Sequence, residues 1–345
     1  MSFHVSLQPS GREFWVARDE AILAAAIRQG IGMPYGCRDG ACGSCKSRLH
    51  SGRVIHGAHQ HKALSLAEEA SGWVLPCCAM PQTDCVVEAR GVTGVGDFAV
   101  LKMPTRVVSI SRRSADVVAI KLQLPGNQNF QYRPGQYIDF ILAGGLRRSY
   151  SMANAPHTVG HPPAIELHIR HMPGGRFTDQ MFAALKEKDI LRVEGPFGSF
   201  CLREGSDKPI ILLASGTGLA PIKAIIEQMQ AKPIARPVTL YWGCRSRADL
   251  YLDDWARALP EQLPGLHYLP VLSEPRQSDE WTGRVGLVHR AVMADFSDLS
   301  GHEVYACGVP AMVDAAQRDF GGLCGLPPEA FFSDAFISEA DKHGN

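Results

Sequence analysis

The chain has no excess of charge of either sign, since 35 lysines and arginines balance 35 aspartates and glutamates among its 345 residues. This balance argues against nucleic acid as a partner, because proteins that bind it present a basic surface. No apolar run comes near the length of about 20 residues that a membrane span needs. The first residues lack a basic stretch followed by an apolar one, so we expect no secretory signal.

Cysteine, by contrast, is not scarce, because the chain has ten. Ten cysteines without an export signal predict a reducing compartment, so we expect a cytoplasmic protein rather than one held by disulfides. Four of them are scattered along the chain, and we expect these to be small buried hydrophobic residues: Cys85, Cys201, Cys244 and Cys324.

Three further thiols lie within nine residues, in the segment Cys37-Arg-Asp-Gly-Ala-Cys42-Gly-Ser-Cys45. The spacing C-x4-C-x2-C is that of plant-type 2Fe-2S sites, in which four thiolates hold two irons. The small residues between the thiols let backbone N–H groups approach the sulfurs. A fourth thiol is available from Cys77 or Cys78. A zinc site is a poorer match, since zinc sites more often pair two C-x2-C knuckles or a Cys/His pair.

The first domain, residues 1–95, is predicted to be a small β-grasp, ferredoxin-like fold around this loop. We expect a helix with Asp19 as its N-cap and Gly30 at its end. The expected strands and helix cover residues 3–7, 13–17, 21–28, 46–49 and 85–89. Three histidines lie between residues 56 and 61, which we interpret as a solvated loop without a metal. Residues 91–96 contain three glycines and predict a linker.

Residues 101–205 predict an antiparallel β-barrel, because alternating or β-branched segments follow one another between Pro-Gly turns. We expect strands at 107–111, 117–124, 136–142 and 165–170, and one helix at 177–186. The string Arg148-Ser-Tyr150-Ser151 suits a flavin: an arginine pairs with pyrophosphate, a tyrosine stacks on the ring and a hydroxyl reaches N5. Gly174 and Gly175 open the helix that contains Thr178, a start that suits a phosphate.

Residues 206–337 change character, since short apolar runs alternate with helical segments as in a doubly wound, parallel α/β domain. Strands are expected at 209–214, 238–242, 267–272, 303–307 and 330–332, and helices at 222–229, 249–258, 287–294 and 312–320. After the first strand comes Gly216-Thr217-Gly218-Leu-Ala-Pro221, a turn suited to pyrophosphate. Pro221 replaces the third glycine of the usual dinucleotide fingerprint. The predicted class is therefore multi-domain, α+β and α/β.

Three landmarks now stand in a fixed order: the string at 148–151, the glycine turn at 216–221, and Cys307-Gly308-Val-Pro310. Together they resemble the ferredoxin–NADP reductase superfamily. With a ferredoxin-like domain in front, the chain is similar to the reductase components of bacterial oxygenases and to the reductases of CDP-6-deoxy-hexulose dehydration, such as CDP-6-deoxy-delta-3,4-glucoseen reductase. The resemblance covers nearly the whole chain.

This resemblance implies the roles of individual residues. It favours Cys77 as the fourth cluster ligand, because the family places that thiol four residues before a proline, and it favours FAD over FMN. Tyr150, Ser151 and Cys307 are the residues expected to act in the reaction. The implied flavin set comprises Arg148, Tyr150, Ser151, His168, Ile169, Arg170, Gly174, Gly175 and Thr178. The implied nicotinamide set comprises Gly216, Thr217, Gly218, Pro221, Glu274, Cys307 and Gly308, with Phe336 as a loosely fitting terminal aromatic residue.

Glu274 departs from the pattern of NADP-using relatives, which tend to carry an arginine after the serine equivalent to Ser273. A carboxylate repels a 2′-phosphate and accepts a hydrogen bond from a ribose hydroxyl, so we expect NADH. Arg245 and Arg247, after the second strand, weigh toward NADPH.

The expected function is a reductase that passes electrons from NADH through FAD and the 2Fe-2S cluster to a partner protein. An oxygenase, a sugar-nucleotide dehydrase or another redox protein could be that partner. Two alternatives stay open at this point. One is a flavin reductase that releases reduced flavin, and the other is a non-catalytic iron–sulfur subunit of a larger complex.

Overall fold

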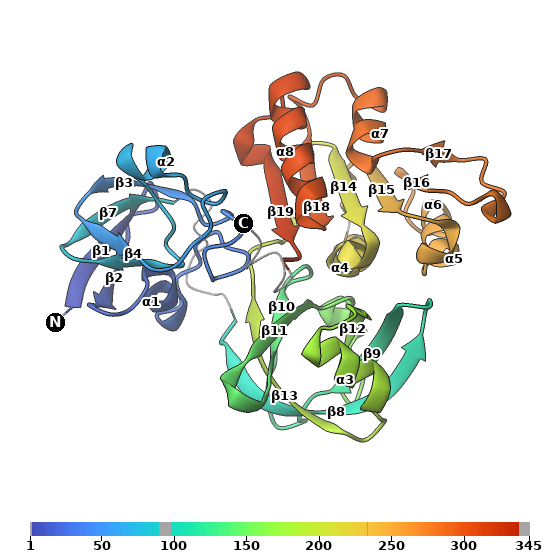
Figure 1. The fold of residues 1–345 in the computed structure, drawn as a ribbon, viewed down its shortest axis with the longest axis horizontal. Coiled ribbons are helices and arrows are strands. Elements are labelled where there is room, and N and C mark those ends of the chain that lie inside the picture. The colour runs from blue at the N-terminus through green and yellow to red at the C-terminus, as the bar shows by residue number, and fades with distance from the viewer. Residues whose placement is uncertain (1, 90–97, 233, 338–345) are drawn as a thin grey trace. The chain divides into compact units, whose positions relative to one another are not determined.

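The computed structural model describes residues 2–89, 98–232 and 234–337 (Figure 1). These residues form two compact units: one comprises the described residues up to 99 together with those from 334 onward, and the other comprises 100–333. The predicted linker at 91–96 lies outside the described residues. Among the described residues, no helix is long and apolar enough to cross a membrane.

The first unit contains a mixed sheet in the strand order β2-β1-β7-β3-β5. Strand β1 runs parallel to β7 and antiparallel to β2, as the predicted β-grasp fold requires. Alternate side chains of β1 point inward, so Val5 and Leu7 are fully buried. The elements are β1 (Ser2–Gln8), β2 (Arg12–Ala17), α1 (Ile22–Arg28), β3 (Ser47–Ser51), β4 (Val54–His56), α2 (Leu66–Ala70), β5 (Trp73–Val74), β6 (Ala79–Pro81) and β7 (Cys85–Glu88).

Two predictions for this unit are wrong in detail. Asp19 does not cap α1, because the helix begins after Ala21, too far along the chain for the Asp19 side chain to reach. The histidine segment is not entirely loop, since His56 ends β4 and its side chain is buried. Helix α2 was not expected, although Ser65 and Glu68 form a capping box that the sequence displays.

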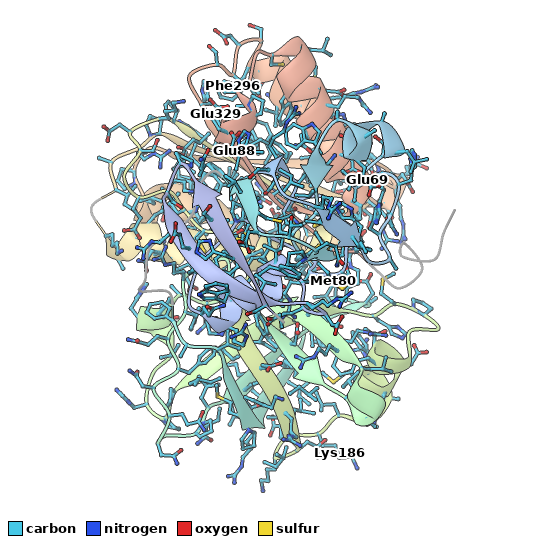
Figure 2. The ribbon with its side chains drawn as sticks, turned by 90° about the vertical axis from the view of Figure 1, so that its left-hand side faces the viewer. Glu69, Met80, Glu88, Lys186, Phe296 and Glu329 are labelled. Atoms are coloured by element: carbon cyan, nitrogen blue, oxygen red, sulfur yellow. The ribbon has the colours of Figure 1, made fainter. Side chains whose placement is uncertain are left out.

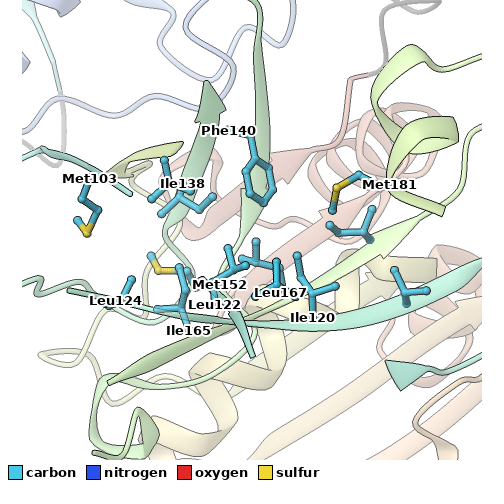
Figure 3. Packing of buried hydrophobic residues seen from close by; sticks show 14 of the residues in the cluster. Met103, Ile120, Leu122, Leu124, Ile138, Phe140, Met152, Ile165, Leu167 and Met181 are labelled. Carbon is cyan, nitrogen blue, oxygen red and sulfur yellow. The ribbon is translucent and has the colours of Figure 1, made fainter. Parts of the chain in front are cut away.

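The second unit begins with a six-stranded antiparallel sheet in the order β11-β10-β13-β8-β9-β12. A bridge between Met152 and Leu167 joins the two ends of this order, which closes the sheet into the predicted barrel. Apolar side chains such as Ile120, Phe140 and Leu167 fill its interior (Figure 3). The elements are β8 (Leu101–Arg112), β9 (Val117–Gln123), β10 (Tyr137–Ile141), β11 (Arg147–Ser151), β12 (Ala164–Arg170), α3 (Arg176–Ala184) and β13 (Ile190–Phe197).

The second sheet of this unit has the order β17-β16-β15-β14-β18-β19. Strand β14 runs parallel to both β15 and β18. The chain order reverses between β14 and β18, and such switch points are where doubly wound folds bind nucleotides. The elements are β14 (Ile210–Ser215), α4 (Leu219–Ala231), β15 (Val238–Cys244), α5 (Asp253–Arg257), α6 (Leu259–Gln262), β16 (Leu266–Leu272), β17 (Arg284–Val285), α7 (Val288–Asp295), β18 (Glu303–Gly308), α8 (Pro310–Leu323) and β19 (Phe331–Ala335).

The four scattered cysteines are buried, as predicted: Cys85, Cys201, Cys244 and Cys324. They serve as small apolar side chains in the two units.

Candidate functional site

The loop from residue 36 to 45 turns its backbone N–H groups toward sulfur. The N–H groups of Ala41 and Cys42 each lie 3.3 Å from Cys37 Sγ. Those of Cys37 and Ser44 each lie 3.4 Å from Cys42 Sγ. Gly40 has the left-handed φ of 76° that a glycine adopts without strain. A Cβ there would lie 2.7 Å from the Cβ of His59, so only glycine lets the loop pack this closely.

The thiols meet in two pairs. The Cys37 thiol donates to Cys42, which lowers the pKa of Cys42 to about 6, while the same contact raises the pKa of Cys37. The Cys45 thiol likewise donates to Cys77, which with a bond from Cys78 and the N–H of Gly40 lowers the pKa of Cys77 to about 4. Two pairs of sulfurs surrounded by N–H donors suit a two-iron cluster, in which each iron takes two thiolates.

Cys77 and Cys78 are distinguished by their contacts. Cys77 shares a hydrogen bond with Cys45, whereas Cys78 Sγ lies 3.6 Å from the carbonyl oxygen of Leu75. The loop before Cys77 is braced by His56, whose Nε2 accepts from the Leu75 N–H at 3.2 Å. His56 Nδ1 contacts Glu69, labelled in Figure 2, at 2.8 Å. This geometry supports Cys77 as the fourth ligand.

Tyr150 and Ser151 are the last two residues of strand β11. The Tyr150 ring lies 5.7 Å from both Phe140 and Phe177, measured between ring centroids, so its orientation is fixed. Burial raises its pKa, which keeps the hydroxyl protonated. Ser151 is buried, and Arg148 Nη1 donates to the carbonyl oxygen of Arg147 at 2.7 Å.

The turn before α3 is held by the buried hydroxyl of Thr178. This hydroxyl accepts from the Met172 N–H at 3.1 Å and donates to the Met172 carbonyl oxygen at 2.9 Å. A Cβ on Gly175 would lie 2.8 Å from both Met172 O and Thr178 Oγ1, so the turn needs glycine there. Gly174 is exposed, with a left-handed φ of 80°. Thr178 therefore shapes the turn rather than offering a spare hydroxyl.

His168, Ile169 and Arg170 end strand β12 in three different environments. Ile169 is fully buried in the barrel core, and the His168 ring contacts Glu166 and Tyr251, so these two residues offer a ligand only their backbone. The Arg170 guanidinium differs, because its Nε lies 3.3 Å from Asp116 Oδ2 while its buried Nη2 has no hydrogen-bond partner. Its Nη1 lies 2.8 Å from where a Cβ on Gly216 would stand. A guanidinium that pairs with Asp116 through Nε and keeps Nη2 without a hydrogen bond, beside a glycine turn, fits a phosphate.

The turns after β14 and β18 touch at the switch point. A Cβ on Gly218 would lie 2.1 Å from the carbonyl oxygen of Cys307, and one on Gly308 would lie 2.1 Å from Ser215 Oγ. Ser215 Oγ accepts from the Val309 N–H at 2.9 Å, a contact that the sequence analysis missed. We call the surface that Gly218 and Gly308 form the glycine cradle. It is lined by backbone, and turns of this kind approach a pyrophosphate through their backbone.

The other predicted nicotinamide residues border this cradle. Thr217 and Pro221 are buried in the first turns that lead into α4, and Cys307 is fully buried, so its thiol is not available as a nucleophile. Glu274 is exposed after β16, and its N–H donates to the Arg245 carbonyl oxygen at 2.8 Å. Phe336 lies outside residues 100–333, so its place at the flavin stays a prediction.

Arg245 and Arg247 are both engaged with carboxylates or backbone. Arg245 lies 3.2 Å from Asp249 and 3.5 Å from Asp116, while Arg247 Nη1 donates to the Asp279 carbonyl oxygen at 3.2 Å. Because these contacts already engage both arginines, the two are poorer candidates for binding the 2′-phosphate of NADPH.

Comparison with known families finds three successive matches along the chain. Residues 5–82 match 2Fe-2S iron-sulfur cluster binding domains, residues 104–201 match oxidoreductase FAD-binding domains, and residues 212–318 match oxidoreductase NAD-binding domains. The thiol pairs lie in the first of these regions, strand β11 with Tyr150 lies in the second, and the glycine cradle lies in the third.

Some relatives match nearly the whole chain. The CDP-6-deoxy-L-threo-D-glycero-4-hexulose-3-dehydrase reductase of Yersinia pestis is 40% identical over 98% of this chain and 99% of its own. Reductase component 2 of terephthalate 1,2-dioxygenase from Comamonas sp. is 32% identical over 99% of this chain and 100% of its own.

Among solved structures, the Amycolatopsis cytochrome P450 reductase GcoB matches with a TM-score of 0.80 at 32% identity. That match covers 97% of this chain and 98% of the other. The fold, the three sites and these relatives agree, and the chain belongs to the iron–sulfur flavoprotein reductases of the ferredoxin–NADP reductase superfamily.

Proposed function

We propose that this chain takes electron pairs from NADH and delivers single electrons to a partner protein, using FAD and a 2Fe-2S cluster. The observation that supports this most is the presence, in one chain, of two pairs of sulfurs ringed by N–H donors and of a bare-backbone cradle at the switch point. A flavin takes two electrons as hydride and gives them up singly, whereas the cluster accepts one.

The chain's own residues hold and orient these groups. We assign Cys37, Cys42, Cys45 and Cys77 as cluster ligands, with the N–H groups of the loop stabilising the negative sulfurs. Tyr150 presents a ring that Phe140 and Phe177 hold in place, and we assign the buried Ser151, the next residue of β11, to the flavin as well. Hydride transfer needs no general base, and the buried Cys307 limits sterically how a nicotinamide lies.

For the nucleotide, we propose NADH over NADPH. Glu274 is an exposed carboxylate just after β16. The hydrogen bond to Asp249 raises the pKa of Arg245, and the charges of Asp116 and Glu274 raise it further. A 2′-phosphate arriving here would meet the Glu274 carboxylate and an arginine that already has acidic neighbours. A ribose hydroxyl would instead find an acceptor.

The electron acceptor is proposed from the relatives. The Yersinia pestis relative is named for a sugar-nucleotide dehydrase, and its 40% identity exceeds the 32% of the terephthalate dioxygenase relative. We therefore place a CDP-hexulose dehydrase first and an oxygenase component second. A cytoplasmic location, expected from the sequence, stays a prediction that cell fractionation would test.

Two observations separate this function from its alternatives. Free-flavin reductases need no cluster, whereas this chain carries a complete set of four thiols. A non-catalytic subunit would have no need of the glycine cradle that Gly218 and Gly308 form.

The test is to purify the protein anaerobically, measure iron, sulfide and flavin, and add NADH. We expect about two irons and one FAD per chain, FAD retained through gel filtration, and immediate bleaching of the flavin. Stoichiometric zinc without iron, or FAD lost on the column, would contradict the proposal. Affinity capture from lysate, with the oxygenase and dehydrase as alternatives, would identify the acceptor.

A further inference from the structure

Helix α4 carries an ion pair that reaches from the nucleotide-binding sheet to the barrel. The helix begins just after the glycine turn at 216–218, and Lys223 and Glu227 lie one turn apart on it. Lys223 Nζ donates to the Ala153 carbonyl oxygen at 2.9 Å and to Glu227 Oε1 at 2.5 Å. Glu227 Oε2 accepts from the Ala155 N–H at 2.7 Å. The pair thus binds a stretch of barrel backbone at two points.

The barrel segment it binds follows Ser151 directly. Residues 151–155 are all buried, and the segment is fixed from the barrel side as well, because the Ala153 N–H donates to the Glu166 carbonyl oxygen at 2.7 Å. Ala153 stands two positions after Ser151, and Lys223 stands five positions after Gly218. One short path between the flavin strand and the nicotinamide turn therefore runs through this ion pair.

A second series of contacts runs from Lys223 through the barrel strand β12 to the glycine turn at 216–218. Glu166 Oε1 lies 3.7 Å from Lys223 Nζ and 2.9 Å from His168 Nε2. His168 Nδ1 lies 3.0 Å from the hydroxyl of Tyr251, whose ring packs edge-on against Trp242 at 5.3 Å between centroids. Trp242 Nε1 then donates to the carbonyl oxygen of Gly216 at 2.9 Å, which ends the chain of contacts at the nicotinamide turn.

The protonation states of His168 and Tyr251 are compatible with the hydrogen bonds in this series of contacts. Burial lowers the pKa of His168, so its ring is neutral near pH 7, with Nε2–H donating to Glu166 and Nδ1 accepting from Tyr251. Burial raises the pKa of Tyr251, so its hydroxyl keeps the proton that it donates. Lys223 is 9% exposed and sits between two carboxylates, and an unpaired charge at that depth would be costly.

We propose that Lys223 and Glu227 are positioning residues for hydride transfer, which hold the glycine turn at its working distance from Tyr150 and Ser151 without touching either cofactor. This proposal rests on the proposed function. Because a displacement of about 1 Å can lower a rate on the order of 100-fold, loosening the pair affects the chemical step more than nucleotide binding.

The experiment uses the FAD- and cluster-loaded protein and four variants, one of which is Lys223→Arg. Glu227→Gln and Lys223→Met remove one charge each and keep most of the side-chain volume. The matched control is Lys232→Met, which removes a half-exposed ion pair with Glu204, 2.7 Å long, at the far end of the same helix. Anaerobic stopped-flow measures the limiting rate of flavin bleaching at saturating NADH and the apparent Kd, while FAD content and Tm are measured in parallel.

We expect both pair variants to bleach about 10- to 100-fold more slowly at saturation, with Kd, FAD content and Tm close to wild type, and Lys223→Arg to recover part of the rate. Lys232→Met should match wild type. Bleaching of both pair variants within about twofold of wild type, or slowing that only follows lost FAD or a lower Tm, would overturn the positioning role alone. If Lys223→Met does not fold, Glu227→Gln decides. Wild-type protein that NADH does not bleach would overturn the proposed function, and the positioning role with it.

Discussion

Replacing Gly218 with alanine isolates the contact between the two turns at the switch point. Gly218 has helical backbone angles, φ −58° and ψ −13°, which alanine adopts without strain, so any loss must come from the added Cβ. That atom would lie 2.1 Å from the carbonyl oxygen of Cys307 and 2.5 Å from its carbonyl carbon. Both are backbone atoms, and neither can rotate away as a side chain would.

The size of the effect follows from these distances. Real Cβ contacts essentially never fall under 3.0 Å, so the two turns must separate by roughly 1 Å. We expect the limiting rate of flavin reduction by NADH to fall on the order of 100-fold, and stability to fall by about 1–3 kcal/mol through overpacking.

The assay is anaerobic stopped-flow at saturating NADH, with thermal melting as the measure of stability. Gly205→Ala is the matched control, since a Cβ there meets nothing within 4 Å. Gly218→Ala protein that reduces its flavin as fast as the control would refute the reasoning that these turns together form the nicotinamide cradle.

Three further predictions follow from the sites. Glu274→Arg should lower the preference for NADH over NADPH, measured as the ratio of kcat/KM values, by at least about tenfold; an unchanged ratio would show that Glu274 does not read the ribose. Cys42→Ser should keep NADH-to-ferricyanide activity and lose electron delivery to a protein acceptor, and equal loss of both would contradict the proposed order. Burial opposes ionisation of Glu166, but its bond to His168 and the charge of Lys223 outweigh burial and lower its pKa to about 2. Because the folded pKa lies below the usual 4.5, this carboxylate stabilises the fold above pH 4.5 by about 3 kcal/mol at most. Glu166→Gln should therefore be less stable than wild type in guanidinium unfolding near neutral pH, and the difference should shrink toward pH 2; a pH-independent difference would contradict this.

Much of the cluster site could be predicted because its information is local. The spacing of Cys37, Cys42 and Cys45 determines which sulfurs share a loop, and the glycines between them can be read directly from the sequence. Spacing along the sequence does not distinguish Cys77 from Cys78 as the fourth ligand, because the choice depends on which thiol meets Cys45 in space. For the same reason His56 was read as part of a loop, although its contact with Leu75 braces the ligand segment.

The contacts between the barrel and the nucleotide-binding sheet were the least predictable. Lys223 and Glu227 read as a plain i,i+4 pair on an amphipathic helix, and nothing local shows that their other partners are backbone groups at 153 and 155, about 70 residues earlier in the chain. Ser215 was passed over in the same way, because its partner Val309 lies on a different turn. Strand alternation predicted the barrel, but β13 (Ile190–Phe197) was missed, since it contains both glycine and proline.

The central claim is that electrons enter as a pair from NADH and leave singly through iron held by the amino-terminal thiols. The most direct test is an anaerobic titration with NADH, followed by optical absorption and by electron paramagnetic resonance of frozen samples. We expect the flavin to bleach and the signal of a reduced 2Fe-2S cluster then to appear, and we expect Cys42→Ser protein to bleach without this signal. Bleaching of the wild type with no iron signal would contradict it.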